Sequence, residues 1–160
     1  IDAKAYFRDA ASGILNKGPM PPRVNQATQF TIHWQITNYS TDLKDVSVKA
    51  SLGGNVKFTG VVKGNGPTSP VFNDRTQEIV WEIPKVLATT GLTGAPMEAI
   101  FQVEATPSSI DLGRNMLLIQ DTGLKAVDEF TGIDISNKDN AITTQLPDDP
   151  TVGGQGMVTQ

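Results

Sequence analysis

The stretch TQFTIHWQITN, residues 28–38, decides the fold class of this chain. Its side chains alternate between apolar and polar with a period of two, which is typical of a β-strand with one buried face. A Trp at the centre of such a strand brings a large apolar contact area and suits the middle of a β-sandwich core. We therefore expect one side of this strand to supply core residues, namely Phe30, Ile32, Trp34 and Ile36.

Further stretches with the same alternation lie on both sides of this strand. The expected strands cover residues 1–8, 28–38, 45–52, 56–62, 78–83, 97–106, 116–119, 124–127 and 130–135, with a weak strand at 156–159. Trp81, Phe101 and Val103 fall on inward positions of these strands. About eight to ten short strands separated by turn signals favour an all-β fold, an immunoglobulin-like antiparallel β-sandwich with long loops. A β-barrel is the alternative fold.

Proline and glycine set the expected limits of several segments. Residues 9–24 are rich in both, so we expect a connection without strands there, because Pro cannot donate a ladder hydrogen bond. Residues 63–73 are polar and rich in Gly and Pro, which predicts a loop. Pro84 is expected to end the strand that begins at Glu78.

The composition restricts the classes of function. A length of 160 residues suits one domain over residues 1–160, with a first strand and Pro-rich connection at 1–25 and a Pro/Gly-rich tail at 147–160. The net charge is −4 and no basic stripe occurs, so nucleic acid is not an expected partner. No apolar run approaches the ~20 residues of a membrane span, so no membrane insertion is expected. Cysteine is absent, which excludes disulfides, thiolate metal sites and Cys nucleophiles.

Several segments also resemble those of a known family. The segments PPRVNQATQFTIHWQITN (21–38), EIVWEIPKV (78–86), AIFQVEATPSSIDLG (99–113), TGLKAVDEFTG (122–132) and TTQLPDDP (143–150) are similar to bacterial "conserved repeat" immunoglobulin-like domains, which occur in tandem on long surface proteins. The resemblance covers most of the chain and rests on core strands and turns. It implies an extracellular or cell-surface structural module, with no catalytic residue to carry over.

Few residues suggest chemistry. His33 is the only histidine and is predicted on the outer face of its strand, where we interpret it as a surface or inter-sheet side chain and not as a catalytic base. No GxSxG motif is present. The acidic pairs at 128–129 and 148–149 lack the spacing of a calcium loop and are interpreted as solvated turn charges. The sequence thus predicts no catalytic residue, no metal site, no cofactor and no enzymatic activity.

Two covalent modifications are considered. Asn38 opens an N-x-S triplet, the acceptor pattern for N-glycosylation. Some surface and pilin domains of this fold class form a Lys–Asn isopeptide bond between their first and last strands. Lys4, Glu98 and Asn137 lie on strands suited to such a bond.

The two chain ends suggest a mode of assembly. Sheet edges must be covered, charged or paired, and the first strand places Ile1, Ala3, Ala5 and Phe7 on one side. We expect this strand to be added to the sheet edge of the next copy, a heterologous contact that generates open filaments. The alternative is that both ends pack on their own domain.

Together these features predict a non-enzymatic extracellular structural module, a subunit of a cell-surface filament or pilus-like polymer. The expected partners are copies of the chain itself or adjoining domains of the same surface protein. The alternatives are an adhesive module that binds carbohydrate or protein, and a spacer repeat of a longer surface protein. A binding module should show an exposed aromatic platform, yet only Tyr6 and Tyr39 look available for stacking.

Overall fold

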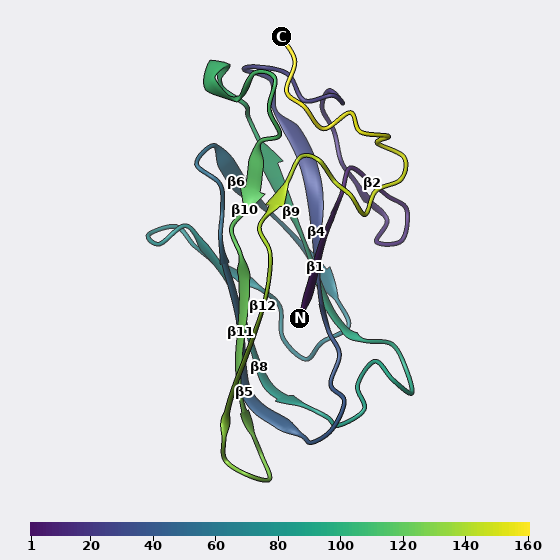
Figure 1. The fold of residues 1–160 in the computed structure, drawn as a ribbon, viewed down its shortest axis with the longest axis vertical. Coiled ribbons are helices and arrows are strands. Elements are labelled where there is room, and N and C mark those ends of the chain that lie inside the picture. Colours follow the sequence, from purple (N-terminus) through teal and green to yellow (C-terminus); the bar gives the residue numbers. More distant parts are fainter.

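Two antiparallel sheets face each other in the computed structural model, which describes residues 1–160 (Figure 1). The first sheet has the strand order β1 (Asp2–Tyr6), β4 (Thr28–Ile36), β9 (Met97–Ala105) and β6 (Val56–Gly64). The second has the order β12 (Asp134–Asp139), β11 (Thr122–Asp128), β5 (Leu43–Ser51), β8 (Glu78–Val86) and β7 (Val71–Asn73). This architecture confirms the predicted all-β, immunoglobulin-like antiparallel sandwich.

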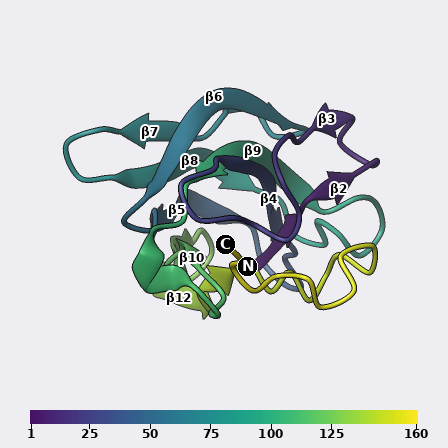
Figure 2. The same cartoon turned by 90° about the horizontal axis from the view of Figure 1, so that it is seen from above.

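Smaller elements lie beside the sandwich and near one of its ends. The two-residue strands β2 (Arg8–Asp9) and β3 (Ile14–Leu15) form a hairpin to one side of it (Figure 2). The strands β10 (Leu117–Ile119) and β13 (Ile142–Thr143) pair near the end where the chain terminates. The single helix, η1, is a 3-10 turn at Ser109–Asp111, and no helix of the structure has the length and hydropathy needed to cross a membrane.

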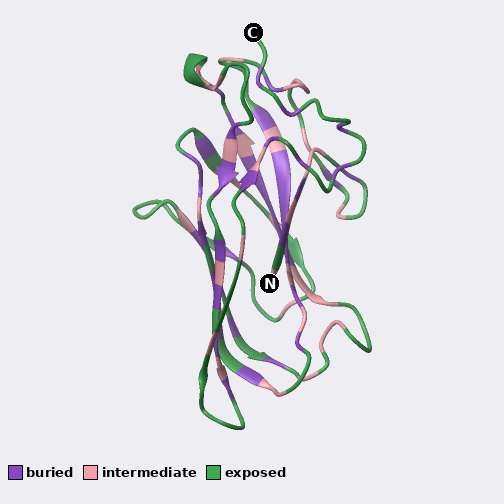
Figure 3. Ribbon diagram, viewed as in Figure 1, coloured by how far each residue is buried: buried purple, intermediate pink, exposed green.

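The core lies between the sheets and is built by the alternation seen in the sequence. One cluster of 29 buried residues joins both sheets, and the burial follows the facing strands while the loops at both ends are exposed (Figure 3). The indole of Trp34 packs edge-on against the ring of Phe101, with 4.9 Å between the ring centroids. The predicted core positions are at most 1% exposed, namely Phe30, Ile32, Trp34, Ile36, Trp81, Phe101 and Val103.

Pro84 does not end its strand, contrary to the sequence prediction. Strand β8 continues to Val86, and the β5–β8 pairing passes from Val46–Ile83 to Lys44–Lys85 without an Asp45–Pro84 pair. Asp45 takes the left-handed conformation there, with φ at 51°. Strand β7 pairs only with the start of β8. On the side of β8 away from β5, no strand therefore lies beside Pro84 that would need a hydrogen bond from its missing N–H.

The last hairpin also differs from its prediction. A strand was expected at residues 130–135, but β12 begins at Asp134, and Phe130 lies in the preceding turn with 89% of its surface exposed. The carboxylate of Asp128 accepts the backbone N–H groups of Phe130 and Thr131, which fixes the turn. The expected loops at 9–24 and 63–73 contain the short strands β2, β3 and β7.

Both chain ends pack on their own domain. Strand β1 pairs with β4 in a register that sets Asp2 opposite Gln35 and Tyr6 opposite Thr31. In the tail, Val158 forms an isolated parallel bridge with Leu112. The predicted weak strand at 156–159 is thus present only as isolated bridges.

Candidate functional site

A buried polar network lies on the outer face of the first sheet, centred on His33. Strand β4 points this side chain away from the core, but the β2–β3 hairpin covers it, so the residue is only 5% exposed. Its Nε2 lies 2.7 Å from Asp9 Oδ2 and its Nδ1 lies 2.9 Å from Glu98 Oε1. The ring of Tyr6 packs edge-on against the imidazole at 5.0 Å. His33 is therefore on the predicted face, yet it is neither on the surface nor between the sheets.

Amide and hydroxyl side chains extend this network under the hairpin. The amide of Asn16 donates to the carbonyl oxygens of Tyr6 and Phe7, and the amide of Gln102 donates to Asn16 Oδ1. The hydroxyl of Ser12 donates to the Asp9 carboxylate. Burial would raise the pKa of Asp9, but hydrogen bonds from Ser12 and His33 outweigh it and leave the pKa below its ordinary value.

The order of these groups does not suit nucleophilic catalysis. In a triad the base touches the nucleophile, whereas here Asp9 lies between Ser12 and His33. Both ring nitrogens of His33 face carboxylate oxygens, so neither is free to take a proton from a substrate. The network fastens the hairpin to the sheet.

The structure does not bring the isopeptide candidates together. Lys4 lies on the outer face of β1, where its Nζ is 2.7 Å from Asp2 Oδ2, and this hydrogen bond raises the pKa of Lys4. Glu98 contacts His33 and Gln35 on the same face. Asn137 instead lies opposite Leu124, on the inner face of the second sheet. A Lys4–Asn137 bond would have to join the outside of one sheet to the inside of the other.

Asn38 is held inside a loop junction. Its amide nitrogen donates to the carbonyl oxygens of Thr41 at 2.6 Å and Leu87 at 3.1 Å, and the residue is 6% exposed. Glycosylation requires a free, accessible amide nitrogen. The folded structure therefore argues against modification at this position and assigns Asn38 to the joining of two loops.

The prediction of solvated turn charges is wrong for Asp128 and Asp149, which are buried because their carboxylates accept hydrogen bonds from the backbone and from neighbouring side chains. Glu129 contacts Lys85 Nζ at 2.6 Å, and Asp128 accepts a hydrogen bond from Thr41 as well as from its own turn. Asp149 accepts the N–H groups of Phe7 and Arg8, each at 2.9 Å. No group of three or more His, Cys, Asp or Glu residues is arranged to hold a metal ion.

The expected assembly strand has a covered edge. Ala3 and Ala5 point into the core and are 8% and 1% exposed, while Ile1 and Phe7 pack against it. On the side of β1 away from β4, the N–H of Ala3 donates to Asp139 Oδ2 at 2.7 Å. Together with the bonds to Asp149, this contact covers the free edge with carboxylates.

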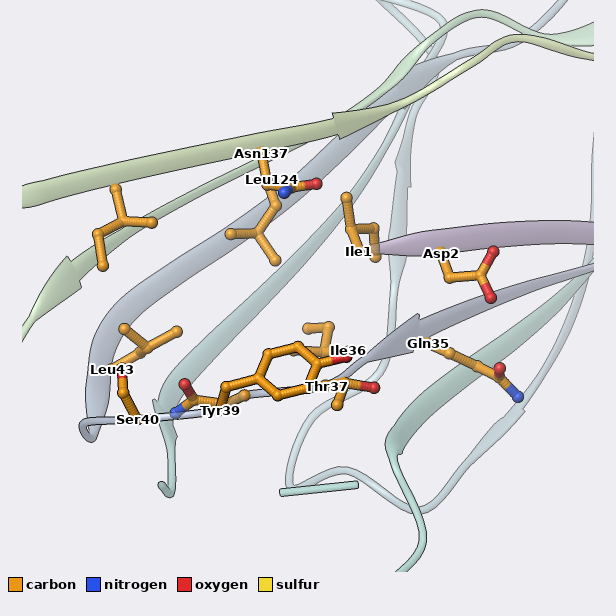
Figure 4. Close-up of a pocket in the computed structure, with 12 residues that line it drawn as sticks. Ile1, Asp2, Gln35, Ile36, Thr37, Tyr39, Ser40, Leu43, Leu124 and Asn137 are labelled. Carbon is orange, nitrogen blue, oxygen red and sulfur yellow. The ribbon is translucent and has the colours of Figure 1, made fainter. Parts of the chain in front are cut away.

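An open groove lies beyond the start of β1, between the end of β4 and the strands β11 and β12 (Figure 4). Its volume is about 430 Å³. The apolar part of its lining comes from both sheets and the loop after β4, namely Ile1, Ile36, Tyr39, Leu43, Leu124 and Ile135. The polar part consists of Asp2, Gln35, Thr37, Asn38, Ser40 and Asn137. Sequence reasoning missed this groove, because its lining comes from strands and a loop that lie far apart in the sequence.

Comparisons with known proteins bear on the fold. No protein-family model and no curated protein matches the sequence. Among solved structures, a variant of BcpA, the major pilin subunit of Bacillus cereus, matches 89% of this chain with a TM-score of 0.50 and 13% identity. Domains D2 and D3 of the major pilin SpaD from Corynebacterium diphtheriae match 89% of the chain with a TM-score of 0.47 and 15% identity.

This likeness shows a shared fold. The chain spans 38% of the BcpA chain and 51% of the SpaD chain that it matches. At 13% identity, the likeness to the BcpA variant shows the fold alone. The resemblance to conserved-repeat domains stays a prediction, since no family model matches.

Proposed function

We propose that this chain is a non-enzymatic structural module of a cell-surface filament, located outside the cell. The observation that carries the proposal is the fold shared with a major pilin subunit over 89% of the chain. The contacts of both His33 ring nitrogens with carboxylate oxygens add support, because they leave the only imidazole of the chain without a nitrogen free to act as a catalytic base. Its partners are copies of itself or adjoining domains of the same surface protein.

For the assembly we propose strand addition by exchange of β1, in which one copy places its β1 beside β4 of the next. Strand β1 is an edge strand at the chain end, and its two inward core side chains are only Ala3 and Ala5. The two fully inward methyl groups contribute far less than buried Val, Ile or Trp side chains would, and the flanking Ile1 and Phe7 are only partly buried, so this strand gains less from the core than the central strands do. Repeated exchange is heterologous and builds an open filament.

The carboxylates that cover β1 are compatible with exchange. Asp139 and Asp149 bind its backbone N–H groups within one copy. In an exchanged assembly the same two residues of the neighbour receive the same strand. Each hydrogen bond that β1 loses within its own copy is thus formed again with the neighbouring copy. The net free energy of exchange therefore depends mainly on the hinge that follows β1 and on the protein concentration.

A disulfide placed across β1 and β4 tests this assembly. Asp2 and Gln35 are direct register partners, and antiparallel partners have Cα atoms within the range that a disulfide spans. The chain has no cysteine of its own, so a variant with Asp2→Cys and Gln35→Cys has only this pair available. The single variants Asp2→Cys and Gln35→Cys are the matched controls.

The variant is oxidised after assembly, and its filaments are examined by negative-stain electron microscopy and non-reducing gel electrophoresis. Exchange predicts a ladder of covalent oligomers from the double variant and at most dimers from either single variant. Filaments whose subunits carry only an internal disulfide would refute exchange but leave the filament function intact. A well-folded chain that forms no filaments would refute the filament function and favour the second candidate, a spacer module, which the self-packed chain ends also favour.

A further inference from the structure

The turn between β11 and β12 holds apolar side chains in solvent, at the end of the sandwich opposite the C-terminus (Figure 1). Phe130 is 89% exposed and Ile133 is 63% exposed. The backbone that carries them is fixed, because the Asp128 carboxylate accepts the N–H groups of Phe130 and Thr131. The N–H of Gly132 also donates to the carbonyl oxygen of Asp128, at 2.8 Å. A side chain on an ordered turn loses little conformational entropy on binding, so Phe130 is suited to anchor a protein interface.

The same turn is acidic. It carries the carboxylates of Asp128, Glu129 and Asp134 and no basic residue. Lys85 contacts Glu129, but it is shared with a further carboxylate, that of Asp42. Asp134 is exposed and forms no ion pair within the chain. The turn therefore suits a partner that combines an apolar pocket with a basic rim, and its charge disfavours an anionic lipid surface.

A hollow of about 520 Å³, the hairpin hollow, lies on the β2–β3 hairpin at one side of the sandwich (Figure 2). Its apolar lining consists of Phe7, Ala10, Ile14 and Leu15. Leu15 is 83% exposed, so it offers an apolar surface to a partner. The polar network beneath the hairpin fastens it to the sheet, which means that the hollow is formed before a partner arrives. Its volume lies within the usual range for binding pockets and admits a phenyl ring.

Basic side chains surround this hollow. Arg8 is part of the lining, and Lys17 follows the last lining residue in the sequence. Lys63 reaches the hairpin from β6, where its Nζ donates to the carbonyl oxygen of Ser12 at 2.6 Å. None of these three basic side chains forms an ion pair within the chain. The only acid of the lining, Asp9, is 8% exposed and turned toward the polar network. The rim is therefore positive where the β11–β12 turn is negative.

We propose that the β11–β12 turn of one copy binds the hairpin hollow of a second copy, with the ring of Phe130 as its anchor. Opposite charges around the two surfaces orient the copies, and burial of the ring against Leu15 supplies the apolar contact. Within one chain the turn and the hairpin lie at different heights of the sandwich, so the contact forms only between copies (Figure 1). Two different surfaces meet, so the contact is heterologous and can repeat along a filament. The inference rests on the proposed self-association, but it uses neither β1 nor its pairing with β4.

Photo-cross-linking of the full chain tests this contact. The photoreactive residue p-benzoylphenylalanine replaces Phe130, and the chain is irradiated at concentrations up to about 1 mM, which detects contacts as weak as a Kd of about 1 mM. We expect a covalent dimer whose cross-linked peptide, identified by mass spectrometry, lies within residues 7–17. The yield should fall as salt is added, because exposed charges are screened. The same photoreactive residue in place of Val71, which is 67% exposed on β7, is the control and should not label that segment.

Charge reversal supplies a second readout in the photoreactive chain. Arg8→Glu and Asp134→Lys should each lower the cross-link yield about threefold, as expected for exposed ion pairs, and the double variant Arg8→Glu/Asp134→Lys should recover most of it. Lys49→Glu changes an exposed lysine on β5, on the other sheet, and should leave the yield unchanged. Circular dichroism reports whether each variant is folded.

The contact and the filament function can fail separately. The proposal is overturned if no dimer forms, if the cross-linked peptide lies outside residues 7–17, or if Arg8→Glu and Lys49→Glu have the same effect. Filaments that show no such cross-link in the electron microscope sample would overturn the contact and leave the filament function intact. A cross-link within residues 7–17 from a chain that forms no filaments would support the contact and count against the filament function.

Discussion

Replacing Asp149 by Asn should uncouple the C-terminal tail from the first strand. This carboxylate is 3% exposed, and its Oδ2 accepts the backbone N–H groups of Phe7 and Arg8. Its Oδ1 accepts the N–H and the hydroxyl of Thr151 at 3.0 and 2.5 Å. One side chain thus satisfies four donors from two distant segments. The adjacent Asp148 is exposed and accepts none, so Asp148→Asn is a control with the same change of charge.

The stability lost in Asp149→Asn follows from the hydrogen-bond donors that an amide side chain pairs with less well than a carboxylate does. A hydrogen bond to a charged group contributes about 1 kcal/mol more than a neutral one, so the bonds to Phe7 and Arg8 weaken together by about 2 kcal/mol. In Asp149→Asn the new amide nitrogen would face the Thr151 N–H, and an unsatisfied buried donor costs about 1–3 kcal/mol. We expect the free energy of unfolding to fall by about 3 kcal/mol for Asp149→Asn and to stay within about 0.5 kcal/mol for Asp148→Asn.

The pH dependence supplies a second, independent readout. Burial would raise the pKa of Asp149, but hydrogen bonds from Thr151, Arg8 and Phe7 outweigh it and lower the pKa below its ordinary value. A carboxyl whose pKa is lowered by folding stabilises the protein above its unfolded pKa, and this contribution is lost as pH falls through the folded pKa. Urea unfolding should therefore show a native–variant gap that is constant above about pH 5 and closes below about pH 4. A gap that persists at acid pH, or a loss equal to that of Asp148→Asn, would refute the reasoning.

Two further predictions concern buried polar atoms. Trp81→Phe should lower the free energy of unfolding by about 1–2 kcal/mol more than Trp34→Phe, measured by urea unfolding. The Trp81 Nε1 donates to Thr68 O at 3.1 Å, whereas the equally buried Trp34 Nε1 has no partner; equal losses would contradict this account. His33→Gln should cost about 2–4 kcal/mol because it removes the imidazole that contacts the buried Asp9, which then keeps only its bonds from Ser12. In a double-mutant cycle, Asp9→Asn should then add much less to His33→Gln than to the native chain, and full additivity would show that the two are not coupled.

Alternation and turn chemistry were enough to predict the fold. The pattern of residues 28–38 anticipates both the strand β4 and the side that it buries, because one buried face imposes a period of two. The same local rules failed where a neighbouring strand or side chain determines the local structure. Pro84 is tolerated because no strand pairs beside it, and Phe130 is exposed because the Asp128 carboxylate draws its N–H into a turn. Neither fact can be read from a single strand.

The polar network shows the same limit for a candidate site. The period of β4 places His33 on the outer face, and that inference agrees with the structure. What covers that face is a hairpin of two-residue strands, too short to carry a period of its own. The contact between Asp9 and His33 joins residues 24 positions apart through this hairpin. Burial of the histidine therefore depends on tertiary packing that local patterns do not encode.

The protection of the sheet edges favours the proposed exchange of β1 over simple edge addition as a route to a polymer. An unprotected edge accepts any strand and leads to aggregation, so natural sheets blunt it. Here β6 carries a bulge around Gly60 and exposed lysines, β7 has only three residues, and carboxylates cover β1. Each device blocks an added strand, yet none blocks a neighbour's β1 from replacing the resident one. Exchange recreates the same covered edge in every copy, so a filament built this way would expose no edge that the single chain does not.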